Sequence, residues 1–148
     1  MRYLMVTGSR NWTNRFVINE YIHDLANRGW LGSECHLING YADGADQQLR
    51  TAAILLGWTP IDYKPKNYQE GWMSYGRACN RRNEAMVDRL AQERLNGHET
   101  LCVAFWKNRS VGTGNTLGML RERGFKPTVF HDCGGYGCCN PEKSWNSA

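Results

Sequence analysis

The chain has 148 residues, 41% of them hydrophobic, and its 18 Lys and Arg against 14 Asp and Glu leave a net charge of +4. This length suits one domain with a sizeable core, and the hydrophobic content excludes a disordered chain. Proteins that bind duplex nucleic acid usually carry a stronger, clustered positive charge. The mild excess therefore fits an anionic small molecule at least as well as nucleic acid.

No apolar stretch approaches the ~18 residues that are needed to span a bilayer. The apolar start, residues 1–6, is too short for a signal peptide. We therefore expect a cytoplasmic protein with no membrane partner, whose cysteines remain free thiols. Cys35 and Cys102 lie in strand-like apolar runs and are expected to be buried.

The pattern along the chain predicts alternating strands and helices. Short apolar runs bounded by turn residues predict strands at 3–7, 35–39, 59–63, 99–106 and 127–131. Helical spacing predicts helices at about 16–25, 45–56, 77–95 and 112–123. This order predicts an α/β protein, a Rossmann-like three-layer sandwich with a mostly parallel five-stranded sheet. We assign residues 1–131 to this domain and residues 132–148 to a Gly/Cys-rich tail.

Ligands of such sheets bind beyond the carboxyl ends of the strands, so the strand-to-helix turns hold the candidate site residues. In the first turn, Gly8 lets the backbone approach a ligand closely. Ser9 and Arg10 offer a hydroxyl and a guanidinium suited to phosphate, and Trp12 ends the turn. A tight turn with an exposed arginine is the alternative interpretation.

The second turn, residues 40–46, contains Gly40, Asp43, Gly44 and Asp46. Either aspartate could cap the following helix, and Asp46 also complements the dipole of the helix from within its first turn. The functional alternative is a carboxylate that contacts ribose hydroxyls or supports a neighbouring arginine.

The third turn leads into a helix whose start carries Arg77, Arg81, Arg82 and Asn83. Cations are disfavoured at a helix N-terminus, and a bound anion would remove this conflict. A solvated basic face is the alternative.

The fourth turn opens the last helix with small and hydroxyl-bearing residues: Ser110, Gly112, Thr113, Gly114, Asn115 and Thr116. Its backbone amides and hydroxyls could hold an anion, although it lacks the lysine of a P-loop. Four such turns at one edge of a sheet predict a phosphate site more strongly than any single turn does.

The ordered motifs Gly8-Ser9-Arg10-x-Trp12, Gly40-x-Ala42-x-Gly44-Ala45-Asp46, Arg82-Asn83-x-x-Met86 and Ser110-x-Gly112-Thr113 resemble those of SLOG domains. The resemblance spans about residues 2–130 and is strongest to the small single-domain branch of bacteria and their phages. SLOG proteins are Rossmann-like and include nucleotide phosphoribohydrolases, DNA-processing proteins and sensors of ADP-ribose-type signals. The resemblance implies that the turn at 112–113 cradles phosphate, that the arginine at 82 faces the ligand, that the residues at 8 and 9 line the pocket, and that the aspartate at 46 supports it.

One position departs from the hydrolase branch of that superfamily. Thr116 stands where those enzymes carry a catalytic glutamate. Cleavage of an N-glycosidic bond needs a carboxylate, so its loss favours binding without turnover. Asp43, Asp46 or Glu84 could supply a carboxylate from another position.

Aromatic residues of the connection before the third helix, Tyr68, Trp72 and Tyr75, are candidates for stacking on a base. A loop pinned to the surface by its own aromatics, or a dimer contact, is equally compatible with them. In the tail, zinc would accept the set His131, Cys133, Cys138 and Cys139. Adjacent cysteines close a tetrahedron poorly, so we expect no metal and a tail that packs on the sheet edge or on a partner.

Three functions therefore stay open at this point. The first is a sensor or sequestering protein that binds a nucleotide or an ADP-ribose-like signal, needs no further cofactor and forms a homodimer or a higher homo-oligomer. The second is a hydrolase or transferase acting on the N-glycosidic bond of nucleoside monophosphates. The third is a DNA-processing module, which the modest charge disfavours.

Overall fold

The computed structural model describes residues 1–65 and 74–132. Within these ranges, the strands are β1 (Arg2–Gly8), β2 (Cys35–Asn39), β3 (Thr59–Asp62), β4 (Glu99–Lys107) and β5 (Thr128–Asp132). The helices are α1 (Arg15–Asn27), α2 (Ala45–Leu55), α3 (Tyr75–Leu95) and α4 (Val111–Glu122). The predicted element order is confirmed. Helix α3 begins two residues before its predicted start because the side chain of Ser74 caps it.

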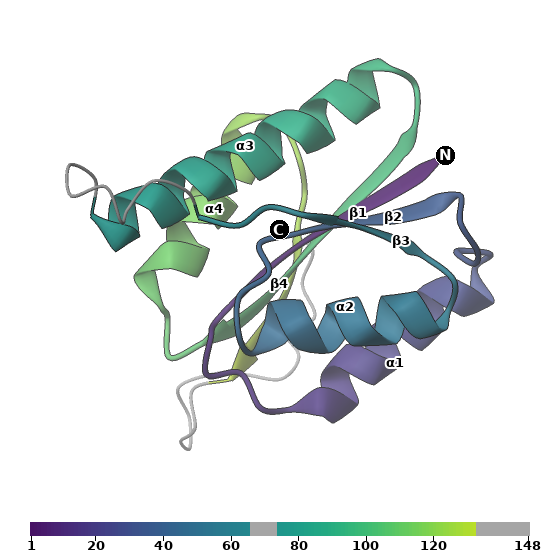
Figure 1. Ribbon diagram of the computed structural model, residues 1–148, viewed down its shortest axis with the longest axis horizontal. Helices are drawn as coiled ribbons and strands as arrows, with labels where there is room; N and C mark the ends of the chain where they lie inside the picture. Colours follow the sequence, from purple (N-terminus) through teal and green to yellow (C-terminus); the bar gives the residue numbers. More distant parts are fainter. Residues whose placement is uncertain (66–73, 133–148) are drawn as a thin grey trace.

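The five strands form one sheet in the order β3-β2-β1-β4-β5, and all four strand pairings are parallel. Helices α1 and α2 cover one face of this sheet, and α3 and α4 cover the other (Figure 1). The fold is therefore the predicted Rossmann-like three-layer sandwich, and its described sheet is parallel throughout.

Both faces of the central strand β1 are buried, as the two helical layers require. Leu4 and Val6 pack toward α1 and α2, whereas Tyr3 and Met5 pack toward α3 and α4. Cys35 and Cys102 are buried, as predicted from their apolar surroundings, and both are free thiols. Burial raises the pKa of Cys102 to about 12.

No helix in the described ranges combines the length and the apolar character that crossing a membrane requires.

The strand order places a topological switch point between β1 and β4, because the chain runs outward from β1 to β3 and then returns to the other side of β1. Crevices for ligands open at such points. Gly8 shapes this one: a Cβ there would lie 2.5 Å from the Cβ of Ala45, so glycine lets the start of α2 sit close to the end of β1.

Candidate functional site

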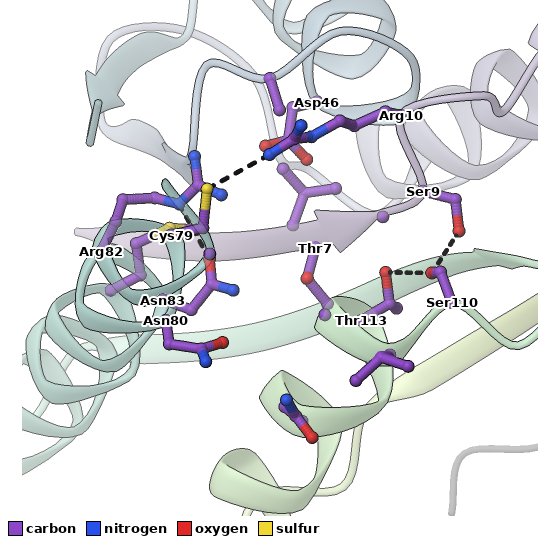
Figure 2. A pocket seen from close by; sticks show the side chains of 18 of the residues that line it. Thr7, Ser9, Arg10, Asp46, Cys79, Asn80, Arg82, Asn83, Ser110 and Thr113 are labelled. Atoms are coloured by element: carbon purple, nitrogen blue, oxygen red, sulfur yellow. Dashed lines mark hydrogen bonds between the residues drawn. The ribbon is translucent and has the colours of Figure 1, made fainter. Parts of the chain in front are cut away.

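A cavity of about 450 Å³ opens at the carboxyl ends of β1 and β4, at the switch point of the sheet (Figure 2). Its walls come from the turn after β1, the turn after β2, one side of α3 and the first turn of α4. Among the described residues, two arginines and one aspartate line it, and these three charges sum to a positive value when all are ionised. The four turns predicted from the sequence thus meet at one place.

Helix α4 points its N-terminal end at the cavity. Ser110 occupies the N-cap position without capping the helix through its side chain. Among the described residues, the backbone amides of Val111, Gly112 and Thr113 donate to no protein acceptor, and the first amide bonded back to the cap is that of Gly114. A helix end with free amides is suited to bind an anion.

The turn before α4 adopts an unusual backbone conformation. Asn108 and Arg109 are consecutive non-glycine residues, each with a φ of 52°. Such conformations cost on the order of 1–3 kcal/mol each and are concentrated at functional sites. This turn carries the chain from β4 into α4, so that the residues after it line the cavity.

A chain of hydroxyl groups ties this turn to β1. The Ser9 Oγ lies 2.8 Å from the Ser110 Oγ, and the Ser110 hydroxyl donates to the Thr113 Oγ1 at 3.1 Å. The Ser9 Oγ also accepts the backbone amide of Lys107 at 2.8 Å. The Ser9 side chain is buried and already bonded, so it acts on the site by fixing the start of α4.

Arg82 holds the turn after β2 from the other side of the cavity. Its Nη1 donates to the Gly40 carbonyl at 2.7 Å, and its Nε donates to the Asn83 Oδ1 at 2.9 Å. Gly40 has no room for a side chain, since a Cβ would lie 2.9 Å from both the Arg82 guanidinium and the Asp46 Oδ2. The guanidinium is therefore fixed in place at the cavity wall.

Asp46 lies at the start of α2 and is only 5% exposed. Its Oδ2 accepts the Gly40 amide at 3.1 Å. Burial raises the pKa of this carboxyl to about 6, although the charge of Arg82 and the amides of Ala42 and Gly40 act in the opposite direction. A buried carboxyl with a raised pKa in a cavity is a candidate functional group.

Arg10 crosses the mouth of the cavity toward α3. Its Nη2 donates to the Cys79 Sγ at 3.2 Å, and its guanidinium stacks over the Tyr75 ring at 4.6 Å from the centroid. The side chain thereby connects the turn after β1 with the first turns of α3 (Figure 2). Burial is the main cause that raises the pKa of Tyr75.

Most of the predicted site residues line this one cavity: Gly8, Ser9, Arg10, Asp46, Arg82, Asn83, Ser110, Gly112, Thr113 and Asn115.

Other predicted residues lie elsewhere because they serve the packing of the fold. Trp12 is in the core, where its ring meets Phe105 edge-on and its indole N–H donates to the Asn14 carbonyl. Thr116 is fully buried, and its hydroxyl donates to the Gly112 carbonyl at 3.0 Å. Neither side chain lines the cavity.

Four further candidates, two glycines and two exposed charged residues, do not line the cavity either. A Cβ at Gly44, where φ is +83°, would lie 2.4 Å from the Arg10 carbonyl oxygen, so this glycine lets two turns touch. Gly114 packs close to the Trp106 ring. Asp43 and Arg77 are exposed and do not line the cavity.

Several predicted residues, Tyr68, Trp72, Cys133, Cys138 and Cys139, lie outside the described residues. Tyr75 is described as the first residue of α3 and is 41% exposed. The ring of His131, in β5, lies 5.3 Å from that of Trp106, and its pKa is lowered by burial. In residues 1–65 and 74–132, no group of three or more His, Cys, Asp or Glu side chains could hold a metal.

The cavity also has lining residues that the sequence did not single out, among them Asn11, Gly76, Cys79 and Asn80. Three of these belong to α3, and together with Asn83 and Met86 they lie along one side of the helix at intervals of three and four residues. Helical spacing is the signal that could identify this side of α3, although the arginines at the helix start are more conspicuous in the sequence.

No family model matches this chain. It is similar to the Gene 61 protein of Mycobacterium phage D29, with 27% identity over 133 residues. The matched region covers 89% of this chain and 98% of that protein. The similarity thus covers most of both chains, and the resemblance to SLOG domains stays a prediction.

Proposed function

We propose that this chain binds a nucleotide or a nucleotide-derived molecule, such as an ADP-ribose species, with a phosphate group against the start of α4. The observation that carries the proposal is the set of backbone amides at residues 111–113, which face a cavity and have no acceptor among the described residues. Arg10 and Arg82 add positive charge to the same cavity. Amides and guanidinium groups together form the usual receptor for phosphate.

The size and lining of the cavity support a ligand larger than phosphate alone. About 450 Å³ lies within the range of small-molecule sites. The side-chain amides of Asn11, Asn80 and Asn115 supply both donors and acceptors, as the polar edges of a base or a sugar require.

Binding without turnover is favoured by the surroundings of Thr116. This residue replaces the catalytic glutamate of the hydrolases that the sequence resembles, and its side chain is buried with a satisfied hydroxyl. We therefore favour a sensor or a sequestering protein.

One observation supports a second candidate, cleavage of an N-glycosidic bond. The Asp46 carboxyl lines the cavity with a pKa of about 6, which suits a group that exchanges a proton near neutral pH. Release of free base from a nucleoside monophosphate by the wild type, and its loss in Asp46→Asn, would favour this candidate over binding alone.

Native mass spectrometry of the purified protein, followed by denaturation and identification of any released small molecule, tests the leading proposal. For a protein that arrives without a ligand, titration with ADP-ribose and AMP by calorimetry completes the test. Saturable binding of a phosphorylated nucleotide supports the proposal. No co-purified nucleotide, together with no measurable binding of either compound or of inorganic phosphate, would contradict it.

A further inference from the structure

One oxygen of Asp46 has no partner in the described protein. The Oδ2 accepts the Gly40 amide, and the Ala42 amide acts on the charge of the carboxyl from nearby, whereas the Oδ1 is buried and makes no hydrogen bond of normal geometry with any described residue. The residue is only 5% exposed and lines the cavity. A buried carboxylate oxygen without a donor is costly, so its presence in a ligand cavity points to a donor that arrives with the ligand.

The charges around Asp46 restrict the kind of donor. The Arg82 guanidinium is fixed beside it by the Gly40 carbonyl and Asn83, and Arg10 also acts on its charge. Two guanidinium groups would repel an ammonium group on a ligand. A neutral hydroxyl suits the place better, because it can donate to the carboxylate and accept from a guanidinium at the same time.

The position of Asp46 relative to α4 restricts the ligand further. In Figure 2, Asp46, Arg10 and Arg82 lie on one side of the end of β1, and Ser110 and Thr113 lie on the other. A phosphate at the start of α4 would therefore leave the Asp46 side of the cavity for a different part of the same molecule. That part carries the hydroxyl.

We propose that the unpartnered Oδ1 of Asp46 accepts a sugar hydroxyl, so that the ligand is a phosphorylated sugar or a nucleotide with at least one free ribose hydroxyl. This inference rests on the proposed phosphate site and adds the sugar and its hydroxyl to it. Arg82 and Gly40 act as positioning residues, since they clamp the turn against which the carboxylate is held.

Calorimetric titration with ribose 5-phosphate and with inorganic phosphate tests the inference, with the ratio of the two dissociation constants as the readout. In the wild type, ribose 5-phosphate is expected to bind at least about tenfold more tightly than phosphate, as expected for a hydrogen bond to a charged group. In Asp46→Asn, this ratio is expected to fall by at least about fivefold, because the acceptor loses its charge.

Asp43→Asn is the matched control, since it makes the same chemical change in the same turn at an exposed residue outside the cavity lining. It is expected to leave the ratio as in the wild type. A ratio that Asp46→Asn leaves unchanged overturns the inference.

The affinities of the wild type for ribose 5-phosphate and for phosphate also test the sugar contact, whether or not the Asp46→Asn variant folds. If phosphate binds and the sugar adds no affinity, the sugar contact is wrong while the phosphate site stands. If neither compound binds, the inference fails, and titration with ADP-ribose and AMP decides whether the proposed function fails with it.

Discussion

Helices α3 and α4 both reach the cavity, and they do so in opposite ways. Helix α4 points its end at the cavity and leaves the amides of residues 111–113 without acceptors in the described protein. Helix α3 is capped by Ser74, whose Oγ accepts the Arg77 amide at 3.2 Å, and it lies along the cavity with one side. The backbone of one helix and the side chains of the other therefore supply the two halves of the site.

Because α3 presents only one side to the cavity, its three N-terminal arginines, Arg77, Arg81 and Arg82, do not have the same surroundings. Successive helical residues are rotated by about 100°, so Arg77 and Arg81 point within about 40° of each other, whereas Arg82 points about 100° away from Arg81. Arg82 lines the cavity, and the other two are exposed. A count of charges at a helix start does not identify the charge that faces a ligand.

The largest expected effect concerns the Asp46 carboxyl, on the α3 side of the cavity. Its pKa of about 6 in the folded protein lies above the ordinary value of 3.8, so its contribution to stability is complete below about pH 4 and is lost as the pH rises through 6. The difference of about two units corresponds to about 3 kcal/mol. Asp46→Asn removes the ionisation, so its free energy of unfolding relative to the wild type should rise between pH 4 and pH 7.5.

Urea denaturation of both proteins at the two pH values measures this difference. An equal difference at both pH values would show that the carboxyl is not perturbed by its burial.

The next effect concerns the side of α3. Arg82→Ala removes a charge-assisted contact and should weaken ligand binding by about 1.5–3 kcal/mol, or roughly ten- to hundredfold. Arg77→Ala removes the same charge from an exposed position of the same helix and should change affinity by less than about twofold. Calorimetry with ADP-ribose compares the two. Equal losses in both variants would mean that overall charge, rather than the cavity, governs binding.

The smallest effect on binding is expected at the capped end of α3. Ser74→Ala removes the cap and should lower the free energy of unfolding by about 0.5–2 kcal/mol. Affinity for inorganic phosphate should stay within about twofold, since this helix end is satisfied by the protein itself. A large loss of phosphate affinity in a folded Ser74→Ala protein would assign the anion to α3 instead of α4.

The sequence predicted much of this architecture because the apolar runs and the turn glycines are local signals. The three layers and the parallel sheet followed from the alternation of elements, and ten of the predicted site residues line one cavity. The turns after parallel strands lie at the same edge of the sheet, however their side chains are oriented. The location of the site could therefore be predicted from the sequence.

The apolar runs and the turn glycines do not predict the direction in which a side chain points. Trp12 follows a turn that resembles a phosphate-binding turn in the sequence, yet its ring packs in the core against Phe105. No motif in the sequence marks Asn80 and Cys79 as site residues, although they lie on the side of α3 that faces the cavity. These outcomes depend on how each helix is rotated against the sheet, and packing between layers determines that rotation.

The central claim is that the open end of α4 receives an anion, and Gly112→Asp tests it most directly. Apart from its chain neighbours and its own helix backbone, a Cβ at Gly112 would meet no atom within 4 Å, so nothing packed against the helix opposes a side chain at its first atom. A carboxylate in the first turn complements the helix dipole and should raise stability by about 0.3–1 kcal/mol. The same carboxylate should repel a bound phosphate and lower phosphate affinity at least about tenfold, with Gly112→Ala as the uncharged control. A more stable protein that has lost phosphate binding is the predicted result, and Gly112→Asp binding phosphate as tightly as Gly112→Ala would contradict the account.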